Sequence, residues 1–433
     1  MISRRNFLKD AAIAGIAAGV FLKQDALARI TNALNEIPSD VPANQIASDE
    51  KFWSQIRAAF EIDKTVINFN NGGVSPAPES VQNALKEYID QTNLLPAYNL
   101  WRVLEPQKEN VREKLAQSFG CNKEEIAFTR NASEALEIVQ LGMELEPGDE
   151  VITTTQDYHR MLTAFDQRER RDKIKVVKIS YPVPLTDFDE LLEKFEKAIT
   201  PKTKAILVSH VVYLTGQIMP IQKISRLAHK HGIKLICDGA QSFNVFPFKQ
   251  KDLECDYFGT SLHKWTMAPI GTGFLYVKKN LIENLWPLMA APEKRKNNIR
   301  KFEELGTHPA ANHNAVAEAL EFNEKIGLER KAERLRFLHS RWIERLKDFD
   351  NVKFNVNIND KTQFCNLVNV NIEGTNVRKL AKYLFDKHKI FVIPIRHKQF
   401  EGIRVSVNVY SSIKETEYFA EVMTSAAKGE IKE

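Results

Sequence analysis

Residues 234–241 read Lys-Leu-Ile-Cys-Asp-Gly-Ala-Gln, an apolar run that ends in an acid, a glycine and an amide. This run predicts a buried strand, Lys234–Cys237, followed by a turn that presents polar groups. Other strand-like runs are Glu125–Thr129, Glu150–Thr154, Lys175–Ile179, Lys204–His210, Tyr257–Gly259 and Gly273–Val277. Helical patterns lie between them, such as Ser133–Gly142, Phe188–Ile199 and Ile221–His231. The alternation predicts an α/β fold with a mainly parallel seven-stranded sheet, helices on both faces, and ligands bound beyond the strands' carboxyl ends.

The pattern changes after about residue 300. A long charged helical region, Ala315–Phe349, precedes the short strand candidates Phe364–Ile372 and Ile403–Val409 and two helices. This order predicts a smaller α+β C-terminal domain, and a chain of 433 residues is long enough for two cores. We expect a linker and an amphipathic helix over residues 29–66, a large domain over 67–300 and a small domain over 301–433.

The first 28 residues have the pattern of a targeting segment. Arg4-Arg5 lies in a twin-arginine signature, an apolar run covers residues 11–22, and Ala26-Leu27-Ala28 fits a cleavage site. We therefore expect a twin-arginine signal peptide over residues 1–28, export by the twin-arginine machinery and a periplasmic location. An uncleaved signal would leave the protein tethered to the membrane.

Composition and spacing disfavour several classes of protein. The net charge of +5 is spread along the chain, so we expect no nucleic-acid partner. The four cysteines form no CxxC pair, and the histidines lack the acidic partners of a metal site, so no metal is expected. Gly271-Thr272-Gly273 lacks a third glycine and precedes a strand, which disfavours a dinucleotide-binding oxidoreductase.

Four loops that follow predicted strands carry polar groups. They are Thr129–Ala135, Gln156–His159, Asp238–Gln241 and Ser261–Lys264. Each has a simple structural explanation, since Asp238 could cap a helix and Asn131 with Glu134 could form a capping box. Their common position after strands instead favours one shared site.

These motifs, in this order, resemble the class V (fold type I) family of aminotransferases that depend on pyridoxal 5′-phosphate (PLP), over roughly residues 66–425. The family includes cysteine desulfurases and isopenicillin N epimerase-like proteins. The resemblance implies a Schiff base between PLP and Lys264, with Asp238 facing the pyridine nitrogen and Gln241 the phenolic oxygen. A lysine amine can form the imine and later move a proton, and the acid keeps the pyridine nitrogen protonated.

The resemblance also implies the other ligands of the cofactor and the substrate. Tyr158 would stack on the cofactor ring, Tyr213 would lie near the phenolic oxygen, and Arg404 would grip the substrate carboxylate. The turn Asn71-Gly72-Gly73 would approach the substrate, and residues 306–309 would enter the active site. The phosphate ligands would be Ala132, Ser133, Ser261, His263 and, from the neighbouring subunit of a homodimer, Thr272.

Two departures bear on the reaction. The stretch Ile393–Gly402, where desulfurases carry a nucleophilic cysteine, contains none, and Cys365 falls in a predicted strand. Tyr158 replaces the histidine that is usual in the desulfurase branch, and the epimerase-like branch tolerates an aromatic residue at this position. We expect a PLP enzyme that acts on an amino acid or related amine, of aminotransferase or epimerase type. The alternatives are a cysteine desulfurase or β-elimination lyase, and a non-catalytic PLP-binding member.

Overall fold

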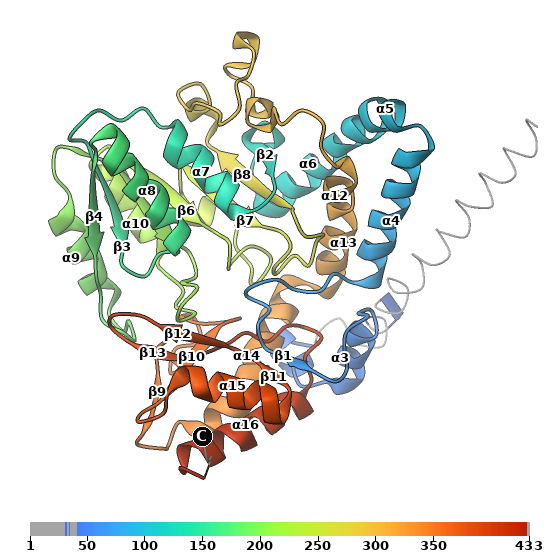
Figure 1. The fold of residues 1–433 in the computed structure, drawn as a ribbon, viewed down its shortest axis with the longest axis vertical. Coiled ribbons are helices and arrows are strands. Elements are labelled where there is room, and N and C mark those ends of the chain that lie inside the picture. Colours follow the sequence, from blue (N-terminus) through green and yellow to red (C-terminus); the bar gives the residue numbers. More distant parts are fainter. Residues whose placement is uncertain (1–30, 33, 35–40, 431–433) are drawn as a thin grey trace, which may run out of the picture.

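The computed structural model describes residues 31, 32, 34 and 41–430 (Figure 1). The twin-arginine segment therefore lies outside the described residues. Within the described part of the chain, no helix is long and apolar enough to cross a membrane.

A seven-stranded sheet forms the centre of the large domain, in the order β2-β8-β7-β6-β5-β3-β4. Its strands are β2 Ile126–Thr129, β3 Glu150–Thr154, β4 Lys175–Ile179, β5 Thr203–Ser209, β6 Lys234–Asp238, β7 Tyr257–Ser261 and β8 Gly273–Val277. Only β8 runs antiparallel to its neighbours in this sheet, β2 and β7. The expected mainly parallel seven-stranded sheet is confirmed, with each predicted strand found within a few residues of its position.

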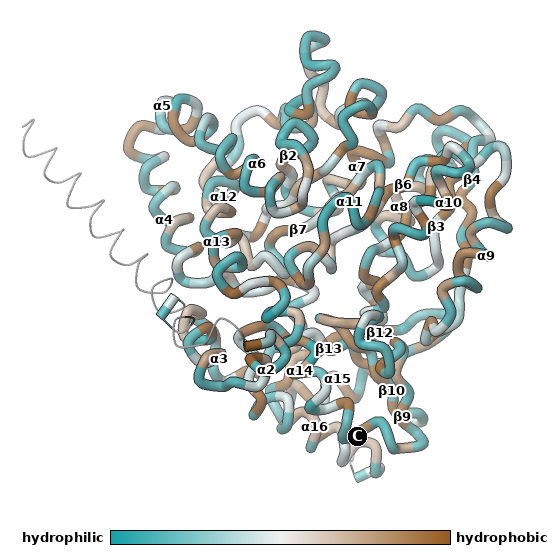
Figure 2. Tube along the Cα trace, turned by 180° about the vertical axis from the view of Figure 1, so that it is seen from behind, coloured by the Kyte–Doolittle hydropathy of each residue, from teal (hydrophilic) through white to brown (hydrophobic). Residues whose placement is uncertain are grey.

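Helices cover both faces of this sheet, as the sequence predicts. In β6, Leu235 and Cys237 pack into one core with α6, α9 and α10, whereas Ile236 packs into a second core with α7 and α8. This alternation follows from the period of two along a strand, and apolar residues on both faces are typical of a buried parallel sheet. Figure 2 shows the outer helices in alternating polar and apolar colours, as expected for helices with one buried face.

The helices around the large sheet and α4 have the following bounds: α4 Glu79–Leu94, α5 Pro96–Tyr98, α6 Glu105–Phe119, α7 Ala132–Gly142, α8 His159–Asp172, α9 Phe188–Ala198, α10 Ile221–Lys230, α11 Gln250–Leu253 and α12 Ala310–Asn314. Shorter turns are η1 Asn99–Leu104, η2 Lys123–Glu125, η3 Lys279–Leu281, η4 Glu293–Arg295 and η5 Ile299–Glu303. The three predicted helices quoted above correspond to α7, α9 and α10.

A four-stranded antiparallel sheet, ordered β12-β13-β10-β9, forms the second, smaller layer below the large sheet (Figure 1). Its strands are β9 Val352–Phe354, β10 Val368–Ile372, β12 Ile393–Arg396 and β13 Glu401–Val405. The helices α14 Leu328–Leu346, α15 Val377–His388 and α16 Ile413–Ala427 share its apolar core.

The sequence expectations for this part are confirmed only in part. The helical region expected over Ala315–Phe349 is present as two helices, α13 Val316–Ile326 and α14, which are separated at Gly327, where φ is +82°. The strand expected over Phe364–Ile372 begins only at Val368, so Cys365 lies in a buried bend and not in a strand.

The N-terminal segment packs near the small sheet. A short strand, β1 Ile67–Asn68, pairs in parallel with β11 Ile390–Phe391. The preceding helices are α2 Ala43–Ile46 and α3 Glu50–Arg57, and α3 buries Phe52, Trp53 and Ile56 in a separate apolar cluster. This arrangement places the turn after β1 beside β13, where Asn70 bridges to Ser406.

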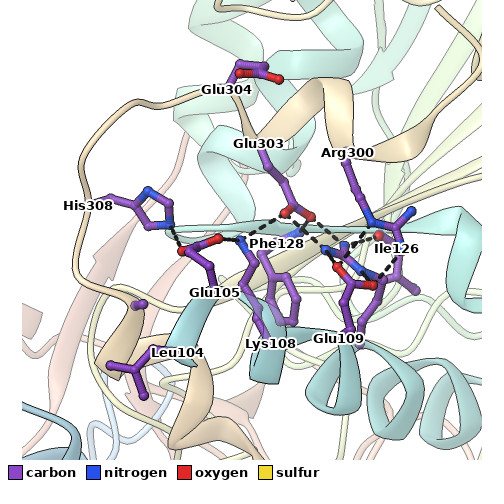
Figure 3. Close-up of polar contacts among 12 residues, drawn as sticks. Leu104, Glu105, Lys108, Glu109, Ile126, Phe128, Arg300, Glu303, Glu304 and His308 are labelled. Carbon is purple, nitrogen blue, oxygen red and sulfur yellow. Dashed lines mark hydrogen bonds and ion pairs between the residues drawn. The ribbon is translucent and has the colours of Figure 1, made fainter. Parts of the chain in front are cut away.

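A buried ionic network fastens η5 to α6 and β2 (Figure 3). Glu303 accepts hydrogen bonds from Arg112 Nη1 at 2.5 Å and from the backbone N–H of Phe128 at 2.8 Å. Lys108 Nζ lies 3.2 Å from the same carboxylate. Although burial opposes the effect, Arg112 and Lys108 lower the pKa of Glu303 to about 2. The network thereby holds the edge strand that leads into the site described next.

Candidate active site

A cavity of about 500 Å³ lies beyond the carboxyl ends of the large sheet. Loops that are far apart in the sequence meet there, as expected for an open α/β sheet. Most of the side chains predicted from the sequence line this cavity: Gly72, Ala132, Ser133, Tyr158, Tyr213, Asp238, Gln241, Ser261, His263, Lys264 and Arg404.

Lys264 and Asp238 form the electrostatic centre of the cavity. Asp238 ends β6, and Lys264 follows the neighbouring strand β7 by three residues. Burial lowers the pKa of Lys264 to about 8, with the Asp238 carboxylate opposing this shift and Arg404 adding to it. Burial raises the pKa of Asp238. The N–H of Ala240, which donates to the carboxylate at 2.9 Å, and the charge of Lys264 both oppose this increase. The pair places a partly deprotonated amine next to an acid.

The N-terminus of α7 provides a site for an anion. Asn131 caps the helix through the N–H of Glu134 at 2.9 Å, and Ser261 Oγ accepts the N–H of Ala132 at 2.9 Å. Ser133 lines the cavity in the first turn, where backbone N–H groups have no partner within a helix. A Cβ at Gly273 would lie 2.8 Å from Asn131 Cα, so only glycine allows β8 to approach this loop.

His263 faces the same end of the cavity. Its Nδ1 is buried without a hydrogen-bond partner in the described part of the chain. Burial, together with the charge of Lys264, lowers the pKa of His263 to about 4. Without an anion in the cavity the imidazole is therefore neutral at physiological pH. Its single N–H is attracted to the Thr272 carbonyl, so an anion at Nδ1 would be bound by the protonated ring.

Arg404 is a buried cation that has no acidic partner among the residues the structure describes. Its side chain comes from β13, and the residue is only 6% exposed. Nη1 donates to the carbonyl of Tyr213 at 3.1 Å and Nη2 to Asn70 Oδ1 at 2.8 Å, whereas Nε has no partner among the described residues. Burial lowers the pKa of Arg404 to about 10. Because an unpaired buried charge is costly, this guanidinium is suited to bind a carboxylate.

Two tyrosines form an aromatic wall. The rings of Tyr158 and Tyr213 meet edge to face, with centroids 5.0 Å apart and an interplanar angle of 84°. Edge-to-face packing is a favoured aromatic geometry, and it holds the Tyr158 ring in one orientation. Burial raises the pKa of Tyr213, so its phenol stays protonated at physiological pH.

Gln241 is engaged on both sides of its amide. Nε2 donates to the carbonyl of Gly72 at 2.8 Å, and Oε1 accepts the indole N–H of Trp265 at 2.8 Å. One N–H of Nε2 remains for a ligand in the cavity. The same contacts hold the glycine turn against the small domain, where a Cβ at Gly72 would lie 2.8 Å from Leu367 Cδ2.

Asn71, Thr272 and the segment 306–309 were predicted to belong to the site but do not line this cavity. Asn71 is buried behind the turn, where its Nδ2 donates to the carbonyls of Asn68 and Ser406 and its Oδ1 accepts from Tyr410. Its side chain therefore positions the turn. Thr272 is fully buried, and its hydroxyl donates to the carbonyl of Pro269 at 2.6 Å. Its expected contact with a neighbouring subunit's phosphate stays a prediction.

Sequence reasoning missed several lining residues. Glu137, Arg160, Met161, Ser209 and Val211 contribute to the wall. Glu137 follows Ser133 by four residues on α7, so helical spacing could have indicated it. Ser209 ends β5 and is tied to the buried Asp157, whose Oδ1 accepts both the N–H and the hydroxyl of Ser209 at 2.7 and 2.8 Å. This link joins the ends of β3 and β5 beneath Tyr158.

The fold and the site together define a fold type I enzyme, and comparison with known proteins agrees. Residues 67–419 match the family Aminotransferase class-V, so the chain belongs to this PLP-dependent family. The chain is 27% identical over 394 residues to isopenicillin N epimerase of Amycolatopsis lactamdurans, covering 87% of this chain and 99% of that protein.

Two solved structures with the same fold are similar to this chain. The apo cysteine desulfurase of Thermococcus onnurineus has a TM-score of 0.76 and 25% identity, covering 87% of this chain and 98% of that chain. A C-DES mutant with glycine covalently linked to its PLP cofactor also has a TM-score of 0.76, at 19% identity, covering 85% of this chain and 98% of that chain. The second likeness concerns the fold alone.

The residues of the cavity fit PLP. The helix N-terminus of α7 suits the phosphate dianion, Lys264 suits the aldehyde, and Asp238 suits the pyridine nitrogen. The unpartnered His263 Nδ1 and Arg404 Nε are buried polar atoms that a phosphate and a carboxylate could satisfy. The expected cofactor is therefore confirmed by the family, and the donor set of this chain matches it.

Proposed function

We propose that this protein acts on the amino group of an amino acid or related amine, with Lys264 as the covalent anchor of PLP and as the group that moves the α-proton. The observation that carries this proposal is the unpaired, buried Arg404 in the same cavity as Lys264. An amino acid brings the carboxylate that Arg404 lacks and the α-carbon that Lys264 must reach. When bound, PLP withdraws electrons from that α-carbon and makes its proton removable.

The remaining side chains would divide the work between the two ligands. Ser133, His263 and the Ala132–Ser261 pair would hold the phosphate, and Tyr158 would support the ring. A pKa near 8 lets Lys264 both accept and return a proton at physiological pH. The glycine turn at Gly72, which Gln241 holds in place, forms part of the cavity wall.

Among the reactions of this family, we favour epimerisation or transamination. Support comes from the similarity to isopenicillin N epimerase over nearly the whole chain. Tyr158 agrees with this branch. The two reactions share Lys264 as acid and base, and they differ in where the proton returns.

A cysteine desulfurase is the second candidate, because relatives at 27% identity include a probable cysteine desulfurase of Pyrococcus abyssi. The β12–β13 hairpin, which contains no cysteine, argues against it. This hairpin docks on the large domain through His397 Nε2 to the Thr155 carbonyl at 3.0 Å and Gln399 Nε2 to the Tyr181 carbonyl at 3.1 Å. Cys365 is fully buried, and burial raises the pKa of its thiol to about 12, which disfavours a reactive thiolate.

We also propose a homodimer and a periplasmic location. An exposed apolar cluster on α4, α5 and η1, formed by Leu94, Leu95, Tyr98 and Trp101, supports a partner surface. The helix α12 connects this cluster to another exposed apolar residue. It contacts α4, and its Asn312 donates to the carbonyl of the exposed Ile270. The location rests on the twin-arginine motif alone, and fractionation of cells that express the full chain would test it.

The central test uses the purified protein loaded with PLP. We expect a visible absorption band that is lost or shifted in Lys264→Ala. Incubation with L-amino acids in D₂O, followed by chiral chromatography and keto-acid detection, separates the reactions. An epimerase yields deuterated D-amino acid, and an aminotransferase yields keto acid. A protein that binds no PLP at Lys264 would overturn the proposal.

A further inference from the structure

The backbone that follows Lys264 is held at each of its next carbonyls. The carbonyl of Lys264 accepts the N–H of Met267 at 3.3 Å. The carbonyl of Trp265 accepts from Lys331 Nζ at 2.5 Å, and that of Thr266 from Asn323 Nδ2 at 2.8 Å. Two side chains from α13 and α14 therefore hold the turn that carries the Lys264 amine.

Lys331 is an unusual donor for this purpose. It is fully buried on α14, and it donates to only one further side chain, Asn323 Oδ1 at 2.7 Å. No carboxylate of the described residues lies within ion-pair distance of its amine, and burial lowers the pKa of Lys331 to about 7. If packing alone mattered, an apolar side chain would be the less costly occupant of this position.

Trp265 connects this donor to the cavity. Its ring lies in the apolar core of the small domain and is 1% exposed. Its indole N–H donates to Gln241 Oε1, and Gln241 in turn holds the carbonyl of Gly72. A displacement of Trp265 would thus reach Lys264 through one peptide bond and the substrate turn through two hydrogen bonds.

We propose that Lys331, together with Asn323, is a positioning residue that aims the Lys264 amine into the cavity by holding the carbonyls of Trp265 and Thr266. This inference rests on the proposed role of Lys264. Lys331 does not line the cavity, so it acts through Trp265 and touches neither substrate nor cofactor. The contact also makes the aim of the amine depend on α14, a helix of the small domain.

The chain offers a matched control in Lys301. This lysine is also buried, at 3% exposed, and it also holds two backbone oxygens, the carbonyls of Ile282 and Lys296 at 2.6 and 2.9 Å. It does not line the cavity. A purely structural role for Lys331 predicts that Lys331→Met and Lys301→Met behave alike, since both variants release buried carbonyls.

The experiment measures Lys264 directly in cofactor-free protein. An amine-reactive acylating reagent labels Lys264 over a range of pH, and peptide mass spectrometry gives the rate and its pH midpoint. A second readout is the rate of PLP capture at Lys264, trapped with borohydride. We expect Lys331→Met to slow capture by roughly ten- to a hundredfold, as misplaced reactive groups do, and to shift the labelling midpoint. Lys301→Met should leave both readouts at the parent values.

Asn323→Leu provides a second variant, because it releases the Thr266 carbonyl while keeping Lys331. We expect a change in the same direction, and this variant decides alone if Lys331→Met does not fold. Parent-like capture and labelling in the folded variants, or equal losses in Lys301→Met, would overturn the inference. If the parent protein itself captures no PLP at Lys264, the proposed function fails instead, so the two failures are distinguishable.

Discussion

The Asp238 carboxylate and the Lys264 amine face one cavity from the ends of the adjacent parallel strands β6 and β7, and each shifts the pKa of the other. Neither group has an ion pair of conventional length to another side chain among the residues described. Their opposite charges are therefore available to a ligand that enters the cavity.

Asp238→Asn should lower the pKa of Lys264 below its present value of about 8. The carboxylate raises that pKa against burial and Arg404, so its removal leaves only the lowering effects. The pH midpoint of Lys264 acylation in cofactor-free protein measures this. Asp166→Asn, a change at a half-exposed acid on α8, serves as control. An unchanged or raised midpoint in Asp238→Asn would contradict the assignment.

Arg404→Leu should weaken amino-acid binding while sparing PLP binding. A hydrogen bond to a charged group contributes about 1.5–3 kcal/mol, so affinity should fall roughly ten- to a hundredfold. Arg404→Lys should weaken amino-acid binding almost as much, because an ammonium group cannot form the two parallel hydrogen bonds of a guanidinium group. Titrating amino acids against the cofactor's absorption measures both. The control is Arg396→Leu on the neighbouring strand β12, and equal losses there would argue against a specific role for Arg404.

Glu303→Gln should destabilise the fold at neutral pH and matter less in acid. The folded-state pKa of Glu303 is about 2 against an ordinary 4.5, so its stabilisation is present above about pH 4.5 and declines as pH falls toward 2. Breaking a buried pair costs about 3–5 kcal/mol. Denaturant unfolding at pH 7 and pH 3 measures the free-energy difference between parent and variant. Glu304→Gln, at the more exposed neighbour, should cost much less at pH 7. A gap that stays equal at both pH values would refute the ionic account.

Cys365→Ala should leave turnover unchanged. The thiol is buried against the carbonyl of Ala332 at 3.7 Å and does not line the cavity. The expected effect is a modest loss of stability only, seen as a lower thermal midpoint. Sulfide release from cysteine, assayed in parent and variant, provides the decisive measurement. Sulfide release that is lost in Cys365→Ala would instead favour a cysteine desulfurase.

The sequence was most informative where side-chain chemistry and local pattern coincide. Short apolar runs such as 234–237 predicted the strands, and the polar residues after them predicted which loops meet, because the carboxyl ends of parallel strands lie at one edge of a sheet. The positions of Asp238, Ser261 and Lys264 at or just after strand ends predicted one shared site, and the resemblance to the class V family implied their roles. Gly327 shows what the local pattern did not predict. It lies within a helical stretch of sequence, yet its positive φ separates two helices.

Contacts between distant segments of the chain could be established only from the tertiary structure. Asn71 and Thr272 lie in the predicted motifs, yet their polar groups are consumed by neighbours that no local pattern indicates. Lys331 lies 67 positions after Lys264 and reads as one of many helical lysines until the fold buries it against Trp265. The sheet and the loops that form the cavity followed from local pattern and residue chemistry in the sequence, whereas the cofactor class followed from the resemblance of the motifs to a known family. The orientation of the cavity residues depends on which buried donors and acceptors meet, and that is set by packing.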